Sequence, residues 1–215
     1  MSIKIDVWGA YACFSRPDMK TDRVTYDVIT PSAARGIIEA IYWHPGLRWV
    51  IDKIYVLNPI RTTCIKRNEV ESKLSNTKAA AMMYGKGDNI NIYTGVDRTQ
   101  RTSIILENVH YVIEAHFVMT SNASVSDNPG KFQDIITRRL KRGQCYHQPY
   151  FGCREFPAYF KLWDQAKIPT ISETVDLGYM LMDMDYTQEG NICPMFYRAK
   201  MEKGVIDVRN VEVVM

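Results

Sequence analysis

The chain has 215 residues, 46% of them hydrophobic, which is enough to bury a core and exceeds the usual size of a single small domain. Its formal net charge of +3 permits a polyanionic partner but does not demand one. The N-terminal segment alternates polar and apolar residues without a long apolar run, which excludes a signal peptide or a membrane span there. We therefore expect a cytoplasmic protein, one domain with an extension, that makes no membrane contact.

Five cysteines are scattered along the sequence, and none follows the C-x-x-C spacing. Their odd number and spacing argue against a disulfide framework and against a structural zinc site. We expect reduced, mostly buried thiols and no metal or other cofactor.

The N-terminal part predicts a strand followed by a helix. Residues 3–14 alternate as a strand and lead into a polar loop at 15–23. Thr30 and Pro31 have the character of an N-cap and a first helical residue. They predict a helix over 31–43.

Two strand-like segments follow, at 47–57 and 61–70, separated by Asn58-Pro59. Turn residues between two such segments predict a hairpin. The next segment, 72–100, is polar and contains glycines, so we expect an insertion or mobile loop rather than core.

A second β region is predicted over 102–120, with Asn108 as its turn. Asn128 then opens a second helix, 130–142, which Gly143 closes. These signals repeat the strand and helix order of the first half.

The order β-α-β-β-α-β is completed by an extended aromatic segment at 149–163. It predicts an α+β, ferredoxin-like (split βαβ) domain, the topology of common single-strand RNA-binding modules. The tail from about residue 170 predicts strands joined partly by a turn at 202–204. We therefore expect a domain over 1–165 and a small β-sheet extension over 166–215.

The second predicted helix is basic on one flank. Its apolar face is formed by Phe132, Ile135, Ile136 and Leu140, while Lys131, Arg138 and Arg142 align as a cationic stripe that can follow a phosphate chain. A solvated helix face explains the stripe equally well. Arg139 and Lys141 add to the positive charge.

The loop after this helix mixes amide, imidazole, phenol and guanidinium groups. Gln144, Tyr146, His147 and Arg154 contribute these groups beside several aromatic rings. Single-stranded RNA binding uses this mixture, because bases stack on rings or guanidinium planes while polar groups read their edges. The rings are also compatible with strand core.

Nearly the whole chain is similar to one known family. The similarity is carried, in order and with compatible spacing, by "WGAYACFSRP" (8–17), "VTYDVITPSAARGIIEAIYW" (24–43), "NPGKFQDIITRRLKRGQCYHQPYFGCREFPAYF" (128–160) and "LMDMDY" with "PMFYRAKMEKGVIDV" (181–208). These blocks resemble the CRISPR-associated Cas five family, type I-C subtype.

This resemblance implies a ferredoxin-like domain with a β-rich C-terminal extension. It implies an endoribonuclease that cuts the CRISPR repeat in precursor RNA without metal and then stays on the 5′ handle of the guide. It also implies partners, namely the backbone subunits and the large subunit of a surveillance complex, and it leaves room for contact with DNA. Most other branches of the wider family do not cut RNA.

The family's cleavage site has a tyrosine at the end of the first helix and a Lys-His pair at the start of the second. These positions hold Tyr42, Lys131 and, in place of the histidine, Phe132. Metal-free cleavage needs a proton acceptor, a cation for the charge on phosphorus and a proton donor. Lys131 suits the cation, and Tyr42 suits a base of lowered pKa or a group that orients the 2′-OH.

Phe132 cannot transfer a proton, so another group must replace the imidazole. His44 and His147 are the two candidates, His44 being nearer to Tyr42 in sequence. Arg35, next to Tyr42 on the helix, and Phe132 itself are expected to contact RNA. The rival interpretation is a non-catalytic RNA-binding subunit in which Phe132 marks lost chemistry.

Overall fold

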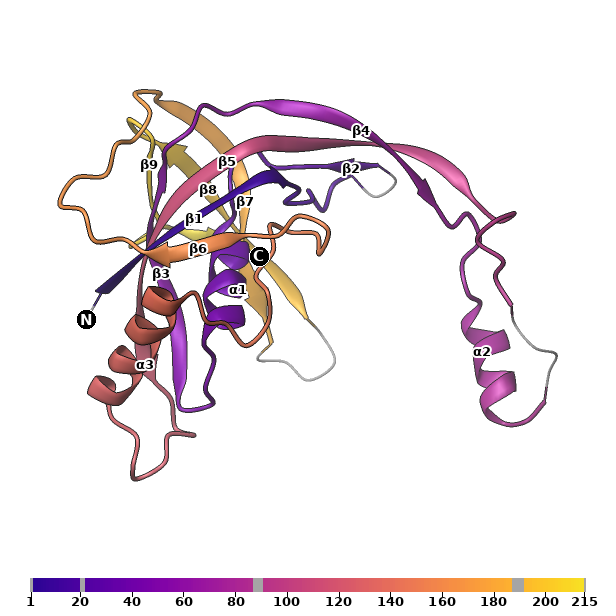
Figure 1. The fold of residues 1–215 in the computed structure, drawn as a ribbon. Helices are drawn as coiled ribbons and strands as arrows, with labels where there is room; N and C mark the ends of the chain where they lie inside the picture. The colour runs from indigo at the N-terminus through magenta and orange to yellow at the C-terminus, as the bar shows by residue number, and fades with distance from the viewer. Residues whose placement is uncertain (1, 20–21, 87–90, 187–191, 215) are drawn as a thin grey trace.

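The computed structural model describes residues 2–19, 22–86, 91–186 and 192–214. Its main sheet has seven strands, five of which form a continuous path. In spatial order these five are β6 (Tyr159–Leu162), β1 (Ser2–Ala12), β5 (Thr99–Met119), β3 (Leu47–Val56) and β9 (Val205–Asp207). The two crossover helices are α1 (Pro31–Ile41) and α3 (Pro129–Arg142). The first four strands and these helices form the predicted ferredoxin-like fold (Figure 1).

Both predicted helices are present, but α1 ends two residues earlier than predicted, at Ile41, and α3 begins one residue earlier, at Pro129. The Thr30 side chain accepts a hydrogen bond from Ala33 N at 3.2 Å, and the Asn128 side chain caps α3 in the same way. Gly143 ends α3 in the left-handed conformation, with φ 63°. The apolar face of α3 is buried at Phe132, Ile136 and Leu140.

The predicted hairpin between 47–57 and 61–70 is wrong. β3 and β4 (Thr62–Glu69) both pair with β5, because this 21-residue strand is long enough to run antiparallel to each of them. Asn58-Pro59 therefore separates β3 from β4 without turning the chain back on itself.

The turn predicted at Asn108 is also wrong, because β5 continues through it. Asn108 has a positive φ of 51°, and its carbonyl accepts a hydrogen bond from Asn58 Nδ2 at 2.8 Å. This hydrogen bond joins Asn58, which lies between β3 and β4, to the irregular position of β5.

The β4–β5 pair extends into an arm that ends in α2 (Asn76–Met83), away from the rest of the molecule (Figure 1). No residue of α2 is buried, which agrees with the prediction that 72–100 is not core, although part of it is helical. Residues 87–90 of that segment, and residues 20–21 of the predicted loop at 15–23, lie outside the described part of the chain. A short strand, β2 (Arg23–Val24), follows this loop and pairs with β5.

The C-terminal part forms a second sheet. Its strands, in order, are β10 (Val213–Val214), β8 (Cys193–Met201) and β7 (Val175–Asp185). The predicted turn at 202–204 is present, with positive φ at Lys203 and Gly204. It leads into β9, which leaves this sheet and adds to the edge of the main sheet beside β3.

The two faces of the main sheet differ in polarity. On β1, Ile5 and Val7 are buried in the core with the helices, whereas Asp6 and Trp8 point to the opposite face, because side chains alternate along a strand. His110 lies directly opposite Trp8 in the β1–β5 register and shares this second face. We call it the open face.

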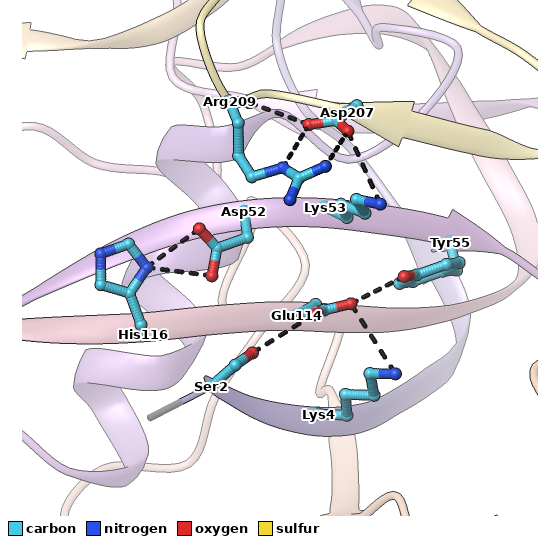
Figure 2. A network of polar contacts seen from close by, with 9 residues as sticks. All are labelled: Ser2, Lys4, Asp52, Lys53, Tyr55, Glu114, His116, Asp207 and Arg209. Carbon is cyan, nitrogen blue, oxygen red and sulfur yellow. Dashed lines mark hydrogen bonds and ion pairs between the residues drawn. The ribbon is translucent and has the colours of Figure 1, made fainter. Parts of the chain in front are cut away.

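Part of the open face is a polar network (Figure 2). Glu114, on β5, accepts hydrogen bonds from Tyr55 Oη at 2.7 Å and Ser2 Oγ at 3.3 Å, and Lys4 Nζ lies 3.8 Å from it. His116 contacts Asp52 at 2.9 Å. His110 and His116, six residues apart on β5, thus share one strand face, and each contacts an aspartate of a neighbouring strand.

The five cysteines are all free, as predicted, but they are less buried than expected. Cys13 is buried, Cys64 is exposed and the other three are half-buried. Among the described residues, no helix is long and apolar enough to cross a membrane, and no group of three or more His, Cys, Asp or Glu side chains is placed to hold a metal ion.

Candidate active site and adjoining groove

The C-terminal end of α1 meets the N-terminal end of α3. Tyr42 is the C-cap of α1, and Lys131 lies in the first turn of α3, where its backbone N donates to the Asn128 side chain at 2.9 Å. Pro129 has no N–H and the N–H groups of Lys131 and Phe132 donate to Asn128, so it is the helix macrodipole that makes this helix start favourable for an anion. The structure thus brings together the two residues that the sequence placed in one site.

Phe132 lies between the other candidates. Its ring is 6.3 Å from that of Tyr42, 5.0 Å from His44 and 6.0 Å from Phe117, measured between centroids. Its exposed fraction is 0%. A fully buried ring is not available to stack on a base, which disfavours the expected contact of Phe132 with RNA; in this structure Phe132 packs against the rings of the site.

Asp127 connects the polar groups of the site, and the sequence reasoning missed it. Its side chain is 1% exposed and contacts Lys131 Nζ at 2.8 Å, and it accepts from Ser124 N at 2.9 Å. These hydrogen bonds, that of Lys131 first, hold the pKa of Asp127 at about 2. The i, i+4 spacing to Lys131 was the signal available in the sequence.

His44 reaches the same carboxylate, with Nδ1 3.9 Å from Asp127 Oδ2. Gly46 N donates to this Nδ1 at 3.0 Å, so the nitrogen acts as an acceptor and the neutral ring carries its proton on Nε2. The side chain is 32% exposed, which leaves it accessible from solvent. Of the two imidazoles considered from the sequence, His44 is the one that lies beside Lys131's partner.

Tyr42 is only 5% exposed, and burial raises the pKa of its phenol above the ordinary value. The positive charges of Arg139 and Lys131 act in the opposite direction without overcoming burial. Tyr42 is therefore a neutral phenol, which disfavours its use as a base and leaves its use as a hydrogen-bonding group.

The loop after α3 covers the end of α1. The backbone N–H groups of Tyr146 and His147 both donate to Ala40 O at 3.0 Å, and the Arg139 guanidinium donates to Ile41 O while it lies 5.0 Å from the centre of the Tyr42 ring. Arg139 is thus bound to the protein and supports Tyr42. His147 contacts the Tyr146 ring at 4.3 Å, a set of neighbours different from that of His44.

A groove of about 890 Å³ separates α1 from this loop. Trp43 and Tyr146 line it and are strongly exposed, at 59% and 74%, and His147 and Arg154 line it as well. Gln144 is exposed just before this loop. Apart from Trp43, which the sequence reasoning overlooked, these are residues predicted for RNA contact or catalysis.

Arg35 has a different environment from the one expected. Its guanidinium forms an ion pair with Asp183 of β7 and lies 3.5 Å from Glu39, and its side chain is 23% exposed. Burial raises the pKa of Glu39, whereas the Arg35 charge lowers it. Arg35 therefore links α1 to the C-terminal sheet, which disfavours the expected RNA contact.

The cationic stripe of α3 is accessible. Arg138, Lys141 and Arg142 are exposed and follow the helix from the candidate site toward Gly143. An α-helix rises about 1.5 Å per residue, so Lys131 and Arg142 are separated by roughly 16 Å along its axis.

The model of a family described as CRISPR-associated protein (Cas_Cas5) matches residues 2–209. The chain belongs to this family. Type I-C, inferred from the four sequence blocks, fits the Cas5d form that the model names. The resemblance found in the sequence is confirmed.

Two curated relatives carry the name CRISPR pre-crRNA endoribonuclease Cas5d. That of Mannheimia succiniciproducens is 50% identical, with 96% of this chain and 94% of the relative covered. That of Thermus thermophilus is 36% identical, with 96% and 90% covered.

Solved structures support the fold. One described as a CRISPR-associated protein matches with a TM-score of 0.71 at 21% identity, covering 100% of this chain and 97% of the other. A chain from a structure described as a CRISPR RNA-guided surveillance complex matches with a TM-score of 0.52 at 12% identity, covering 100% and 89%.

Proposed function

We propose that this chain is a metal-independent endoribonuclease that cuts CRISPR repeat RNA and stays bound to the 5′ handle of the guide. The observation that carries the proposal is Lys131 in the first turn of α3, paired with Asp127 and followed by Phe132, whose ring contacts those of Tyr42 and His44. The names of two relatives that cover nearly the whole chain support the same activity.

Each group has a separate task in this proposal. Lys131 and the positive end of the α3 macrodipole stabilise the negative charge that develops on the phosphate. The Tyr42 phenol orients the attacking 2′-OH by a hydrogen bond. The 2′-oxygen bonds to phosphorus while the bond to the 5′-oxygen breaks, and the 2′-OH proton is released to solvent.

His44 protonates the departing 5′-oxygen through Nε2. To act as an acid the ring must carry a proton on both nitrogens, so Nδ1 must give up its hydrogen bond from Gly46 N; the imidazolium then lies beside Asp127, whose carboxylate stays ionised because its pKa is about 2. A carboxylate so placed stabilises the imidazolium that acts as the acid. His147, in the groove, is the other imidazole that can serve.

RNA binding is assigned to the groove and to the cationic stripe. Trp43 and Tyr146 offer ring faces for unpaired bases, Arg154 offers a guanidinium, and Arg138 and Arg142 offer positive charge for phosphates. In this proposal residues 1–165 carry cleavage and RNA binding, and residues 166–215 form an extension.

We place the protein in the cytoplasm, as a subunit of a type I-C surveillance complex next to its backbone and large subunits. Retention of the 5′ handle gives the cut RNA and the complex a common anchor. Contact with DNA would follow from this position in the complex.

The decisive experiment incubates the purified protein with repeat RNA in EDTA and maps the product ends. We expect cleavage at one site, a 2′,3′-cyclic phosphate on the 5′ fragment, and complete protection by a 2′-deoxy substitution at that site. Cutting of the deoxy substrate at the same position, or loss of activity in EDTA, would instead indicate metal-dependent hydrolysis.

One observation favours a second function. The family's histidine position holds a buried phenylalanine, as expected for a non-catalytic RNA-binding subunit. The variants His44→Ala and His147→Ala separate the cases: a cutting parent slowed only by the former assigns the acid to His44. RNA bound tightly but left uncut by the parent would establish the structural subunit.

RNA affinity should depend on salt through the α3 stripe. For the double variant Arg138→Ala/Arg142→Ala we expect the slope of log affinity against log salt to fall by roughly 0.7 to 0.9 per lost phosphate contact. Lys200→Ala, an exposed lysine of β8, is the matched control. A slope unchanged from that of the parent would exclude the stripe from the RNA path.

A further inference from the structure

The open face of the main sheet holds a hollow of about 340 Å³, separate from the groove beside α1. Trp8, His110 and Tyr159 form its rings and come from three adjacent strands, β1, β5 and β6. Lys161, two residues after Tyr159 on β6, completes it. We call these four residues the ring pocket.

The rings stand in a row because the strand register places them opposite one another. Trp8 pairs in register with Tyr159 on one side and His110 on the other. The Trp8 and Tyr159 rings are stacked, with centroids 6.1 Å apart and planes at 26°, and His110 meets Trp8 edge-on at 6.2 Å. Tyr159 is 54% exposed, so one of its faces is available to a ligand.

A buried carboxylate fixes the polar members of the pocket from below. The Asp6 side chain is 3% exposed, lies 2.6 Å from His110 Nε2 and 3.5 Å from Lys161 Nζ. Lys161 Nζ also lies 5.5 Å from the centre of the Trp8 ring, and its side chain is 60% exposed. A ligand entering the pocket therefore meets an imidazole and an ammonium group, while the acid stays beneath them.

The rest of the open face is organised differently. In the network of Figure 2, the partly buried carboxylates of Glu114 and Asp52 lie beside Lys4 and His116. Toward Trp8 the face becomes concave and aromatic, and Lys161 lies there with 60% of its side chain exposed, above the nearly buried Asp6. The pocket thus joins ring faces to one exposed ammonium group, a combination that suits an anion that carries a ring.

We propose that the ring pocket binds one unpaired nucleotide of single-stranded RNA, with the base stacked on Tyr159 and the phosphate beside Lys161. Base stacking on an aromatic side chain tolerates any sequence, and four-stranded sheets of this topology bind RNA through rings on their surface. RNA as the ligand rests on the proposed function. The pocket itself lies across the sheet from Lys131, so it holds RNA and does not cut it.

The test compares RNA affinity with cleavage. Tyr159→Ala removes the platform at an exposed position, so the fold is preserved, and Tyr159→Phe keeps the ring. The matched control is Tyr179→Ala, at 59% exposure on β7. Binding is measured with an unstructured single-stranded oligonucleotide and with repeat RNA, and cleavage is measured in single turnover at saturating repeat RNA.

We expect Tyr159→Ala to weaken binding of the unstructured RNA about 5- to 150-fold, the range of one stacked base, and Tyr159→Phe and Tyr179→Ala to bind as the parent does. Lys161→Ala should reduce the single-strand salt slope by roughly 0.7. The saturated cleavage rate of Tyr159→Ala should stay within about twofold of the parent's.

Parental affinity of Tyr159→Ala for both RNAs would overturn the inference while leaving the proposed function in place. Equal losses in Tyr159→Ala and Tyr179→Ala would overturn it too, because the effect would not be local. Unchanged RNA affinity with impaired assembly of the complex would assign the pocket to a protein partner. A parent that neither binds nor cuts repeat RNA would overturn both proposals.

Discussion

The two faces of the main sheet use the same residue types in different ways. On the open face away from the ring pocket, carboxylates of neighbouring strands contact the basic side chains: Asp52 lies 2.9 Å from His116, and Glu114 lies 3.8 Å from Lys4. On the helix face, Lys131 also has a carboxylate partner, but it stands at a helix start, where the macrodipole adds to its field. The lysine of the face assigned to cleavage is thus distinguished by its position at a helix end and not by its side-chain type.

The largest test of this comparison is Lys131→Ala. Removing one preorganised group that stabilises transition-state charge costs about 10²- to 10³-fold in rate, so we expect single-turnover cleavage to fall by that factor. Lys200→Ala, an exposed lysine of the second sheet, should cut at the parental rate. Equal rates for Lys131→Ala and the parent would remove the helix face from the reaction.

The second prediction concerns the Tyr42 hydroxyl. Tyr42→Phe keeps the ring under Arg139 and removes one hydrogen bond to a developing charge, worth about 1.5–3 kcal/mol, so we expect cleavage to slow roughly 10- to 150-fold. Tyr111→Phe, another buried tyrosine, is the control for removal of a hydroxyl.

The pH dependence distinguishes the two roles of Tyr42. Burial raises its pKa above the ordinary value, so the phenol stays protonated throughout the neutral and mildly alkaline range. The rate ratio of parent to Tyr42→Phe should therefore be constant between about pH 6 and pH 9. A ratio that grows tenfold with each pH unit would show that the phenolate is the base.

The third prediction tests why an imidazole is absent at position 132. The Phe132 side chain is fully buried among the rings of Tyr42, His44 and Phe117. Phe132→His places a polar ring there, and we expect a loss of about 2–4 kcal/mol in the free energy of unfolding and no gain in cleavage rate.

Phe132→Leu is the apolar control and should lose less, about 1 kcal/mol. Urea unfolding gives the stabilities, and single-turnover cleavage is measured below the transition. A folded Phe132→His protein that cuts faster than the parent would show that the buried position can still serve the reaction.

Local signals predicted the ferredoxin-like core well. Thr30, Asn128 and Gly143 act on their own helices, so their caps could be read without knowledge of the rest of the chain. The β4–β5 arm could not be read in this way, because whether two strand-like segments pair with each other or with a third depends on contacts distant in sequence. Asn58-Pro59 has the composition of a turn in either case.

The candidate site was predicted in part for the same reason. The family resemblance located Tyr42 and Lys131, and the structure places them at one junction. It could not reveal that Asp127 is buried against Lys131, or that Arg35 is engaged by Asp183 from the C-terminal sheet. Burial and ion pairing are properties of the folded chain. Only the structure therefore shows which basic residues are accessible and which are held by carboxylates.

The smallest expected effect concerns a carboxylate of the open face. Glu114→Gln removes the charge that accepts hydrogen bonds from Tyr55 and Ser2 and that attracts Lys4. We expect a loss of about 0.5–1.5 kcal/mol in the free energy of unfolding, the net contribution of a hydrogen bond, because the amide oxygen still accepts one donor. The control is Glu212→Gln, at an exposed position near the C-terminus, which should leave the free energy of unfolding unchanged. Because Glu114 belongs to a network that neutralises itself, cleavage and RNA affinity should both remain parental. A cleavage rate that falls with Glu114→Gln at unchanged stability would contradict the division of labour between the two faces.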